Sequence, residues 1–156
     1  MPGLPVEETA MVRVLRLCLA SVGDFFDGEF RRIGLSEHAF HVLCILFATE
    51  DGRASPSDLS ELVGTSRANM TRILTSLVDD GFATRRAEEM DGRRQTIEIT
   101  EAGRNAALQA VPQLAPSLKS AFSGLSDEEF RSLDQLLRKC IRSFDANASR
   151  LSSAVK

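Results

Sequence analysis

The amino-acid sequence predicts a mainly α-helical fold with one two-stranded β-hairpin near its middle. Apolar residues recur at helical spacing through most of the chain. One central stretch instead alternates apolar and polar residues with the period of two that is typical of strands. The length of 156 residues suits a single domain with a sizeable core.

The first of two short central helices is predicted to begin after Ser55 and to end at Gly64. Serine is a preferred capping residue, and Pro56 suits the first helical position because an amide hydrogen there would have no partner. Asp58 completes a capping-box pattern, and Gly64 supplies the left-handed conformation that ends a helix. The apolar face of this helix is expected to consist of Leu59, Leu62 and Val63.

The second helix is predicted between Ser66 and Gly81, so only Thr65 and Ser66 separate it from the first. A turn this tight makes two helices cross steeply, as in a helix-turn-helix. The buried face is expected to consist of Met70, Ile73, Leu74 and Leu77. The opposite face, which has no acidic residue before Asp79, consists of Arg67, Asn69, Thr71, Arg72, Thr75 and Ser76.

A basic hairpin is predicted directly after the second helix. Residues 82–86 form its first strand, residues 96–99 form its second, and residues 87–95 form a polar tip whose turn is the dipeptide at 91–92. Two arginines follow that turn, at 93–94. A helix-turn-helix with a basic wing is a device for holding double-stranded DNA, although the polar helix face alone is also compatible with an ordinary solvated surface.

The candidate DNA-binding side chains differ in their chemistry. The forked groups of Arg67, Asn69 and Arg72 are expected to pair with base edges, whereas single hydroxyls suit phosphate oxygens. Arg93, at the wing tip, is expected to enter the minor groove. The full predicted set is Ser55, Ser57, Thr65, Ser66, Arg67, Asn69, Thr71, Arg72, Thr75, Arg85, Asp91, Arg93 and Arg94.

Two of these segments resemble the MarR family of multiple antibiotic resistance regulators. Residues 91–103, DGRRQTIEITEAG, are similar to the wing pattern of that family, with Ile99 in place of its usual leucine and Gln95 where a basic residue is common. Residues 65–72, TSRANMTR, are similar to the start of its recognition helix. The resemblance implies a dimeric winged-helix repressor, and a single MarR-like domain is expected over residues 1–156.

The segments on either side of the winged helix, which is placed at about 36–103, are predicted to be dimerisation helices at about 6–33 and 104–150. Apolar residues cover too much of the first helix for burial against one small winged helix, so a second surface must cover them. Pro112 and Pro116 are expected to bend or break the helix that starts after the wing. A dimer would present two recognition helices roughly 34 Å apart.

Composition and charge exclude several classes of protein. The net charge of −3 and the pI of about 5.5 argue against a polybasic nucleic-acid coat. The chain shows no apolar run long enough to span a membrane and no signal-peptide pattern, so we expect a cytoplasmic protein. It also lacks a glycine-rich phosphate loop, a nucleophile elbow and a Cys-x-x-Cys pair, so an enzyme is not expected.

Cysteine and histidine leave two minor alternatives open. His38, His41 and Cys44 recur every three residues on one predicted helix, but their spread along the axis disfavours a shared metal ion, and no metal or cofactor is expected. The three cysteines are expected to be buried thiols. Cys18 also permits a redox switch, although the chain has no tyrosine to activate it as in some relatives.

The resemblance further implies control by a small aromatic or phenolic ligand, bound where the dimer helices meet the winged helix. The predicted ligand-binding residues are Arg16, Phe26, Phe30, Phe40 and His41. Arg16 and His41 would anchor a carboxylate, although an ion pair is the simpler role for Arg16. The sequence therefore predicts a homodimeric repressor of a pseudo-palindromic operator, released by a ligand. The alternatives are a metal or thiol sensor on the same fold and a winged-helix protein-interaction module.

Overall fold

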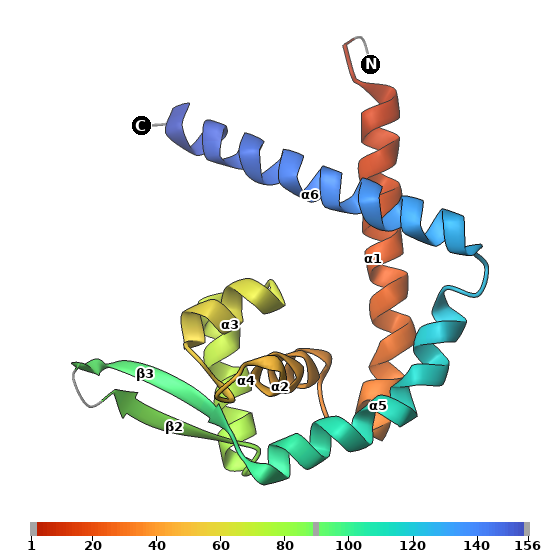
Figure 1. Cartoon of the computed structure of the whole chain (residues 1–156). Coiled ribbons are helices and arrows are strands. Elements are labelled where there is room, and N and C mark those ends of the chain that lie inside the picture. Colours follow the sequence, from red (N-terminus) through yellow and green to blue (C-terminus); the bar gives the residue numbers. More distant parts are fainter. Residues whose placement is uncertain (1–2, 89–90, 155–156) are drawn as a thin grey trace. The chain divides into compact units, whose positions relative to one another are not determined.

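The computed structural model describes residues 3–88 and 91–154 (Figure 1). Within these ranges it describes the side chains of all residues except 87, 88, 91–94, 149 and 151–154. The described residues form six helices and three strands in the order α1, α2, β1, α3, α4, β2, β3, α5, α6. None of the helices in the described ranges is both long enough and apolar enough to cross a membrane.

The helix-turn-helix predicted from capping residues is confirmed. It consists of α3 (Pro56–Val63) and α4 (Arg67–Asp79), which pack with α2 (Glu37–Ala48). The Ser55 hydroxyl accepts a hydrogen bond from the Asp58 amide at 3.1 Å, and Gly64 ends α3 with a φ of 71°. Four predicted residues of α4 are buried: Met70, Ile73, Leu74 and Leu77.

One part of the predicted apolar face of α3 is wrong. Leu62 is 66% exposed, whereas Leu59 is fully buried and Val63 is half-buried. Ser60 is also buried, next to Leu59. The inward side of α3 is therefore centred between Leu59 and Ser60, and at about 100° per residue Leu62 falls well away from that centre.

The wing is a three-stranded antiparallel sheet rather than a two-stranded one. β2 (Ala83–Glu88) and β3 (Asp91–Ile99) form the predicted hairpin, and β1 (Arg53–Ala54) pairs with the other side of β3. A strand of two residues shows no alternation, so sequence periodicity did not predict β1.

The predicted tip of the hairpin is too long. Ala87 pairs with Gln95 and Glu88 pairs with Asp91, with an irregularity in register between these two pairs. The dipeptide at 91–92 therefore belongs to β3, and the turn falls at residues 89–90, outside the described residues.

The core lies within the first of two compact units, residues 1–117 and 118–156. It joins the apolar faces of α2, α3, α4, the sheet and α5 (Glu101–Ala121) with the C-terminal part of α1 (Val6–Arg32). Phe26 and Phe30 are the buried residues of α1. The fully buried large side chains are Val42, Leu43, Leu46, Leu59, Met70, Leu74, Leu77, Ile97 and Leu114.

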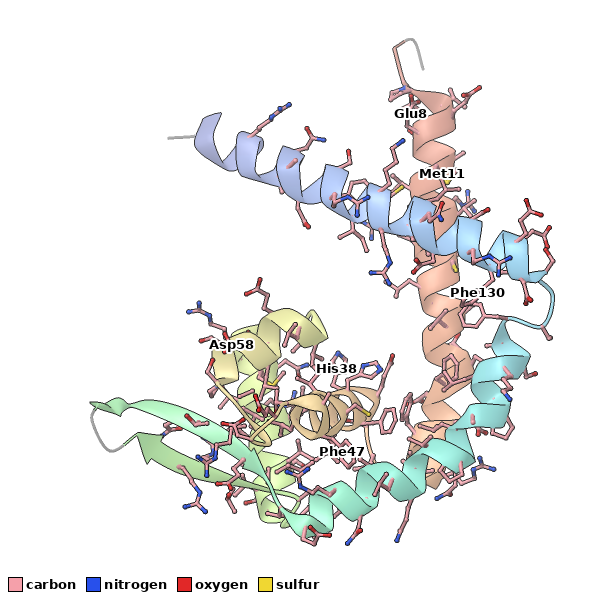
Figure 2. The ribbon with its side chains drawn as sticks, viewed as in Figure 1. Glu8, Met11, His38, Phe47, Asp58 and Phe130 are labelled. Atoms are coloured by element: carbon pink, nitrogen blue, oxygen red, sulfur yellow. The ribbon has the colours of Figure 1, made fainter. Side chains whose placement is uncertain are left out.

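Most apolar residues of α1 remain uncovered in the single chain. Met11 is 58% exposed and Leu19 is 73% exposed (Figure 2). In the second unit, α6 (Asp127–Ala154) begins with the predicted capping box, because the Ser126 amide donates to Glu129 at 2.8 Å and the Glu129 amide donates to Ser126 at 3.3 Å. Six large apolar side chains of α6 are exposed: Phe130, Leu133, Leu136, Leu137, Ile141 and Phe144.

The two prolines of α5 do not break the helix. Pro112 and Pro116 both lie inside one continuous helix, and Figure 1 shows its ribbon bending along its length. Leu114, between the prolines, is 1% exposed, so tertiary packing holds the segment where proline removes helical hydrogen bonds.

A compact junction fixes the base of the wing. The Thr100 amide donates to the Phe82 carbonyl at 3.0 Å, and the Thr100 hydroxyl donates to the Gly81 carbonyl at 2.7 Å. The same hydroxyl accepts from the Gly103 amide at 3.0 Å, which caps α5. The end of β3 and the start of α5 are thereby attached to the segment that follows α4.

Gly103 permits this close approach, and its replacement by alanine should destabilise the fold. A Cβ at this position would lie 2.1 Å from the Phe82 carbonyl oxygen, which is backbone and cannot move aside alone. Gly103→Ala should lower the free energy of unfolding by about 1 to 3 kcal/mol, measured by urea denaturation. Gly28→Ala is the control, since a Cβ at this helical glycine meets nothing within 4 Å. Equal stability of Gly103→Ala and the wild type would contradict this account of the junction.

Candidate nucleic-acid interface

The polar face of α4 is open to solvent, as the sequence predicts. Arg67, Thr71, Arg72 and Thr75 are exposed, and Asn69 is half-buried. The Ser66 hydroxyl caps the helix by accepting from the Asn69 amide at 3.2 Å. The helix has no acidic residue in its first turn, so its positive N-terminal end and its arginines face solvent together.

The hydroxyls on this face are already engaged within the helix. The Thr71 hydroxyl donates to the Arg67 carbonyl at 2.9 Å, and the Thr75 hydroxyl donates to the Thr71 carbonyl at 2.9 Å. The Asn69 side-chain amide donates to the Thr65 hydroxyl at 2.8 Å. A direct phosphate contact from Thr71 or Thr75 would require these hydroxyl hydrogens to leave their carbonyl partners.

The serines of α3 have different roles in the free chain. Ser55 caps α3, whereas the Ser57 side chain is exposed and its carbonyl accepts from the Ser60 hydroxyl at 2.9 Å. Ser57 therefore presents its own hydroxyl to solvent next to the capped start of the helix.

Two adjacent arginines of β2 point in different directions. The Arg85 Nη2 donates to the Thr75 hydroxyl of α4 at 2.9 Å, and its Nη1 lies 3.5 Å from the Gln95 side-chain oxygen. The Arg86 Nε donates to Glu98 instead. Neighbouring residues of a strand alternate between its faces, so Arg85 lies on the side of α4 and Arg86 on the other side.

Glu98 links all three strands on that other side. Its carboxylate pairs with Arg86 of β2 and, at 3.3 Å, with Arg53 of β1. Partial burial alone would raise the pKa of Glu98, but the hydrogen bonds and charges of the two guanidinium groups outweigh it, so the pKa lies below its ordinary value. Sequence analysis missed Arg53, Gln95 and Glu98 because their partners are distant in the chain.

The remaining predicted residues of the wing are only partly described. Asp91, Arg93 and Arg94 lie in β3, but their side chains are outside the described residues. Their predicted contacts with DNA therefore stay predictions.

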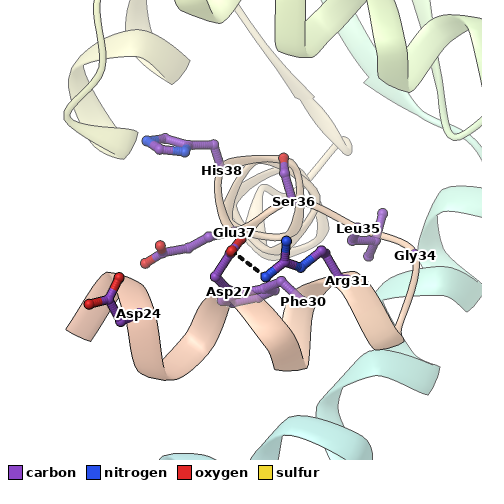
Figure 3. Close-up of a pocket in the computed structure, with 10 residues that line it drawn as sticks. Asp24, Asp27, Phe30, Arg31, Gly34, Leu35, Ser36, Glu37 and His38 are labelled. Atoms are coloured by element: carbon purple, nitrogen blue, oxygen red, sulfur yellow. Dashed lines mark ion pairs between the residues drawn. The ribbon is translucent and has the colours of Figure 1, made fainter. Parts of the chain in front are cut away.

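A cavity of about 670 Å³ opens between the C-terminal half of α1 and the start of α2 (Figure 3). Phe30 and Leu35 form part of its apolar lining. Its charged and titratable lining consists of Asp24, Asp27, Arg31, Glu37 and His38. Arg31 pairs with Asp27 at 2.6 Å, so the carboxylates outnumber the available positive groups and disfavour an anionic ligand.

The predicted ligand residues are only partly brought together. Phe26, Phe30, Phe40 and His41 form a continuous series of ring contacts, with centroid separations of 6.3, 5.9 and 6.0 Å. Phe26 and Phe30 are core residues, each 7% exposed. Arg16 is exposed on α1, and neither Arg16 nor His41 lines the cavity in Figure 3, so the structure does not assemble the expected carboxylate anchor there.

The cysteines differ in accessibility, which corrects the expectation that all three are buried. Cys18 is exposed, because it lies on the uncovered part of α1, whereas Cys44 and Cys140 are half-buried. Burial raises the pKa of the Cys44 thiol, which disfavours the reactive thiolate. Within the described residues, no group of three or more His, Cys, Asp and Glu side chains is arranged to hold a metal ion.

A capped helix-turn-helix, followed by an antiparallel wing docked on its second helix, defines the chain as a winged helix-turn-helix protein. The sequence pattern of the MarR family matches residues 35–94, which cover α2 to the wing. The chain belongs to the MarR family, as the resemblance in the sequence implied.

Curated relatives agree with this assignment. The chain is 35% identical over 96 residues to the HTH-type transcriptional repressor YetL of Bacillus subtilis, a match that covers 62% of this chain and 58% of YetL, less than two thirds of its length. It is 29% identical over 137 residues to the transcriptional repressor MprA of Escherichia coli, covering 86% of this chain and 78% of MprA. These relatives are named as regulators, which agrees with the prediction that the chain is not an enzyme.

Solved structures share the fold. Sco3205, a MarR family transcriptional regulator from Streptomyces coelicolor determined in complex with DNA, has a TM-score of 0.83 at 20% identity, covering 92% of this chain and 91% of that chain. A mutant of MarR from E. coli, complexed with operator DNA, has a TM-score of 0.77 at 19% identity, covering 86% of this chain and 95% of that chain.

The Glu98 ion pairs predict a specific pH dependence. Because the pKa of Glu98 is lower in the folded chain, its stabilisation is complete above the ordinary glutamate pKa of about 4.3 and is lost as the pH falls through the lower folded value. Glu98→Gln should therefore lower Tm at pH 7 and flatten its decline between about pH 5 and pH 3.

The control is Glu61→Gln, which removes an exposed carboxylate for which the described residues show no ion pair. Thermal denaturation followed by circular dichroism at several pH values provides the measurement. If both variants kept the acid dependence of the wild type, the Glu98 ion pairs would contribute nothing measurable.

Proposed function

We propose that this chain is a cytoplasmic transcription regulator that binds a pseudo-palindromic operator as a homodimer and represses transcription. The observation that carries this proposal is the open face of α4, which combines a capped N-terminus, exposed arginines and no acidic residue in its first turn, within a segment that matches the MarR family. A helix of this kind fits the major groove with its N-terminal end toward the bases.

The proposed contacts follow from side-chain chemistry. Arg67, Asn69 and Arg72 contact base edges, and Arg93 at the wing enters the minor groove. Backbone-positioning contacts come from the remaining residues predicted for the interface, which are Ser55, Ser57, Thr65, Ser66, Thr71, Thr75, Arg85, Asp91 and Arg94.

Dimer formation is proposed from uncovered apolar surface. Isolated exposed apolar side chains are ordinary, but α6 presents Phe130, Leu133, Leu137, Ile141 and Phe144 at three- or four-residue spacing, which makes one continuous stripe. A second copy of the chain would cover this stripe and the exposed residues of α1. The whole chain, residues 1–156, then works as one MarR-like domain with dimerisation helices at both ends.

Release of the operator is proposed to follow from binding of a small ligand. The cavity beside α1 and α2 offers an apolar surface for it, formed by Phe30 and Leu35. The carboxylates around this cavity favour a neutral or cationic aromatic compound over the carboxylate expected from the sequence. A gel-shift assay on the DNA upstream of the chain's own gene, with and without such compounds, tests both binding and release.

Replacement of Asn69 distinguishes base recognition from general DNA affinity. Its side-chain amide has two N–H donors and one carbonyl oxygen, and the hydrogen bond to Thr65 orients the group at the start of α4. Asn69→Ala should weaken discrimination at one base position per half-site by about 1 to 3 kcal/mol. Affinities for operator variants with single-base changes measure this. An equal loss of affinity for every variant would make Asn69 a positioning residue.

The stripe on α6 can be tested by charge substitution. Leu137→Asp combined with Ile141→Asp should convert the dimer to monomer, because two carboxylates would be buried without partners. Sedimentation velocity at micromolar concentration provides the measurement. Leu62→Asp is the control, since Leu62 is an exposed leucine of α3 away from the stripe. A monomeric wild-type chain would contradict the proposed dimer.

A further inference from the structure

The inference concerns Arg85 and starts from the partners that hold it. Its guanidinium group joins the wing to α4 through the Thr75 hydroxyl at 2.9 Å, with the Gln95 side-chain oxygen at 3.5 Å as a weaker second acceptor. Both acceptors are neutral. Arg85 is therefore held in position while its positive charge remains uncompensated by these partners.

The opposite face of the sheet differs in this respect. Arg53 and Arg86 share the Glu98 carboxylate, so one negative charge offsets much of their combined charge. Arg85 and Arg86 are adjacent in sequence and both exposed, yet their electrostatic situations differ. A phosphate would be attracted more strongly to the face that carries Arg85.

Thr75 connects Arg85 with the recognition helix. Its hydroxyl hydrogen is donated to the Thr71 carbonyl, and its oxygen accepts from Arg85. A hydroxyl in this arrangement has no hydrogen left for a phosphate oxygen. Arg85 still has N–H groups beyond the two that these contacts use, and arginine binds phosphate through such donors.

We propose that Arg85 is a preorganised phosphate-binding residue that takes over, from the wing, the phosphate contact expected of Thr75. Thr75 is then a positioning residue: it holds the guanidinium beside the exposed face of α4. Gln95, where the family commonly has a basic residue, serves as a neutral second support rather than a phosphate contact. This inference rests on the proposed DNA-binding function and assigns the residue that supplies one of its backbone contacts.

The salt dependence of DNA affinity tests the proposal, because each neutralised phosphate adds about 0.9 to the slope of log K against log salt concentration. The experiment uses the full-length chain and a labelled fragment of the DNA upstream of its own gene, with fluorescence anisotropy between about 50 and 200 mM KCl. Arg85→Ala should lower affinity about tenfold and reduce the slope by about 1, equally for all operator sequences. Arg86→Ala removes the same charge from the opposite face and should leave the slope close to that of the wild type.

Two substitutions of Thr75 separate positioning from charge. Thr75→Val keeps the size and the charge balance but removes the acceptor, so affinity should fall several-fold although Arg85 is still present. Thr75→Ser keeps the hydroxyl and should restore wild-type affinity. Circular dichroism of each variant checks that the fold is intact.

The outcomes are distinguishable. If the wild type binds the fragment and Arg85→Ala keeps its slope, the assignment of Arg85 is overturned while the proposed function stands. If Thr75→Val binds as tightly as the wild type, the positioning role is overturned. If the wild type binds no DNA, both the proposed function and this inference fail.

Discussion

The arrangement of the winged helix depends on the contact between Thr100, Gly103 and the segment that follows α4. One threonine hydroxyl donates to the Gly81 carbonyl and accepts from the Gly103 amide, so it joins the end of α4, the end of β3 and the start of α5 at a single point. The Phe82 carbonyl accepts from the Thr100 amide and lies too close to Gly103 for any side chain there. These short-range constraints determine where the wing starts relative to the recognition helix. The contact from Arg85 to Thr75 is possible because the two elements diverge from this fixed base.

The wing also shows that arginine count is a poor measure of positive surface. Residues 53, 85 and 86 are all exposed arginines, but two of them share one carboxylate and the third is held by neutral groups. A chain with a net charge of −3 can therefore present a local cationic site. The sequence alone does not show this division, because Glu98 is far from Arg53 in the chain and alternates in face with its neighbours.

Features determined by local chemistry were predicted well. The caps at Ser55, Ser66 and Ser126 and the glycine that ends α3 depend on residues within a few positions of one another, so their patterns are visible in the sequence. Features that depend on distant partners were not. The strand β1 exists only through its pairing with β3, and the exposure of Leu62 follows from the direction in which α3 packs.

The candidate ligand site shows the same limit. Helical spacing identified the ring series from Phe26 to His41, but not the carboxylates that surround the cavity, since α1 and α2 had to be packed together first. The two-residue strand β1 has a mechanical consequence at this point. α2 is a rigid rod of about 18 Å whose first turn borders the cavity, and the short loop after it is stitched to β3 through Gly52 and β1. A tilt of that rod is transmitted to the root of the wing without passing through the recognition helix.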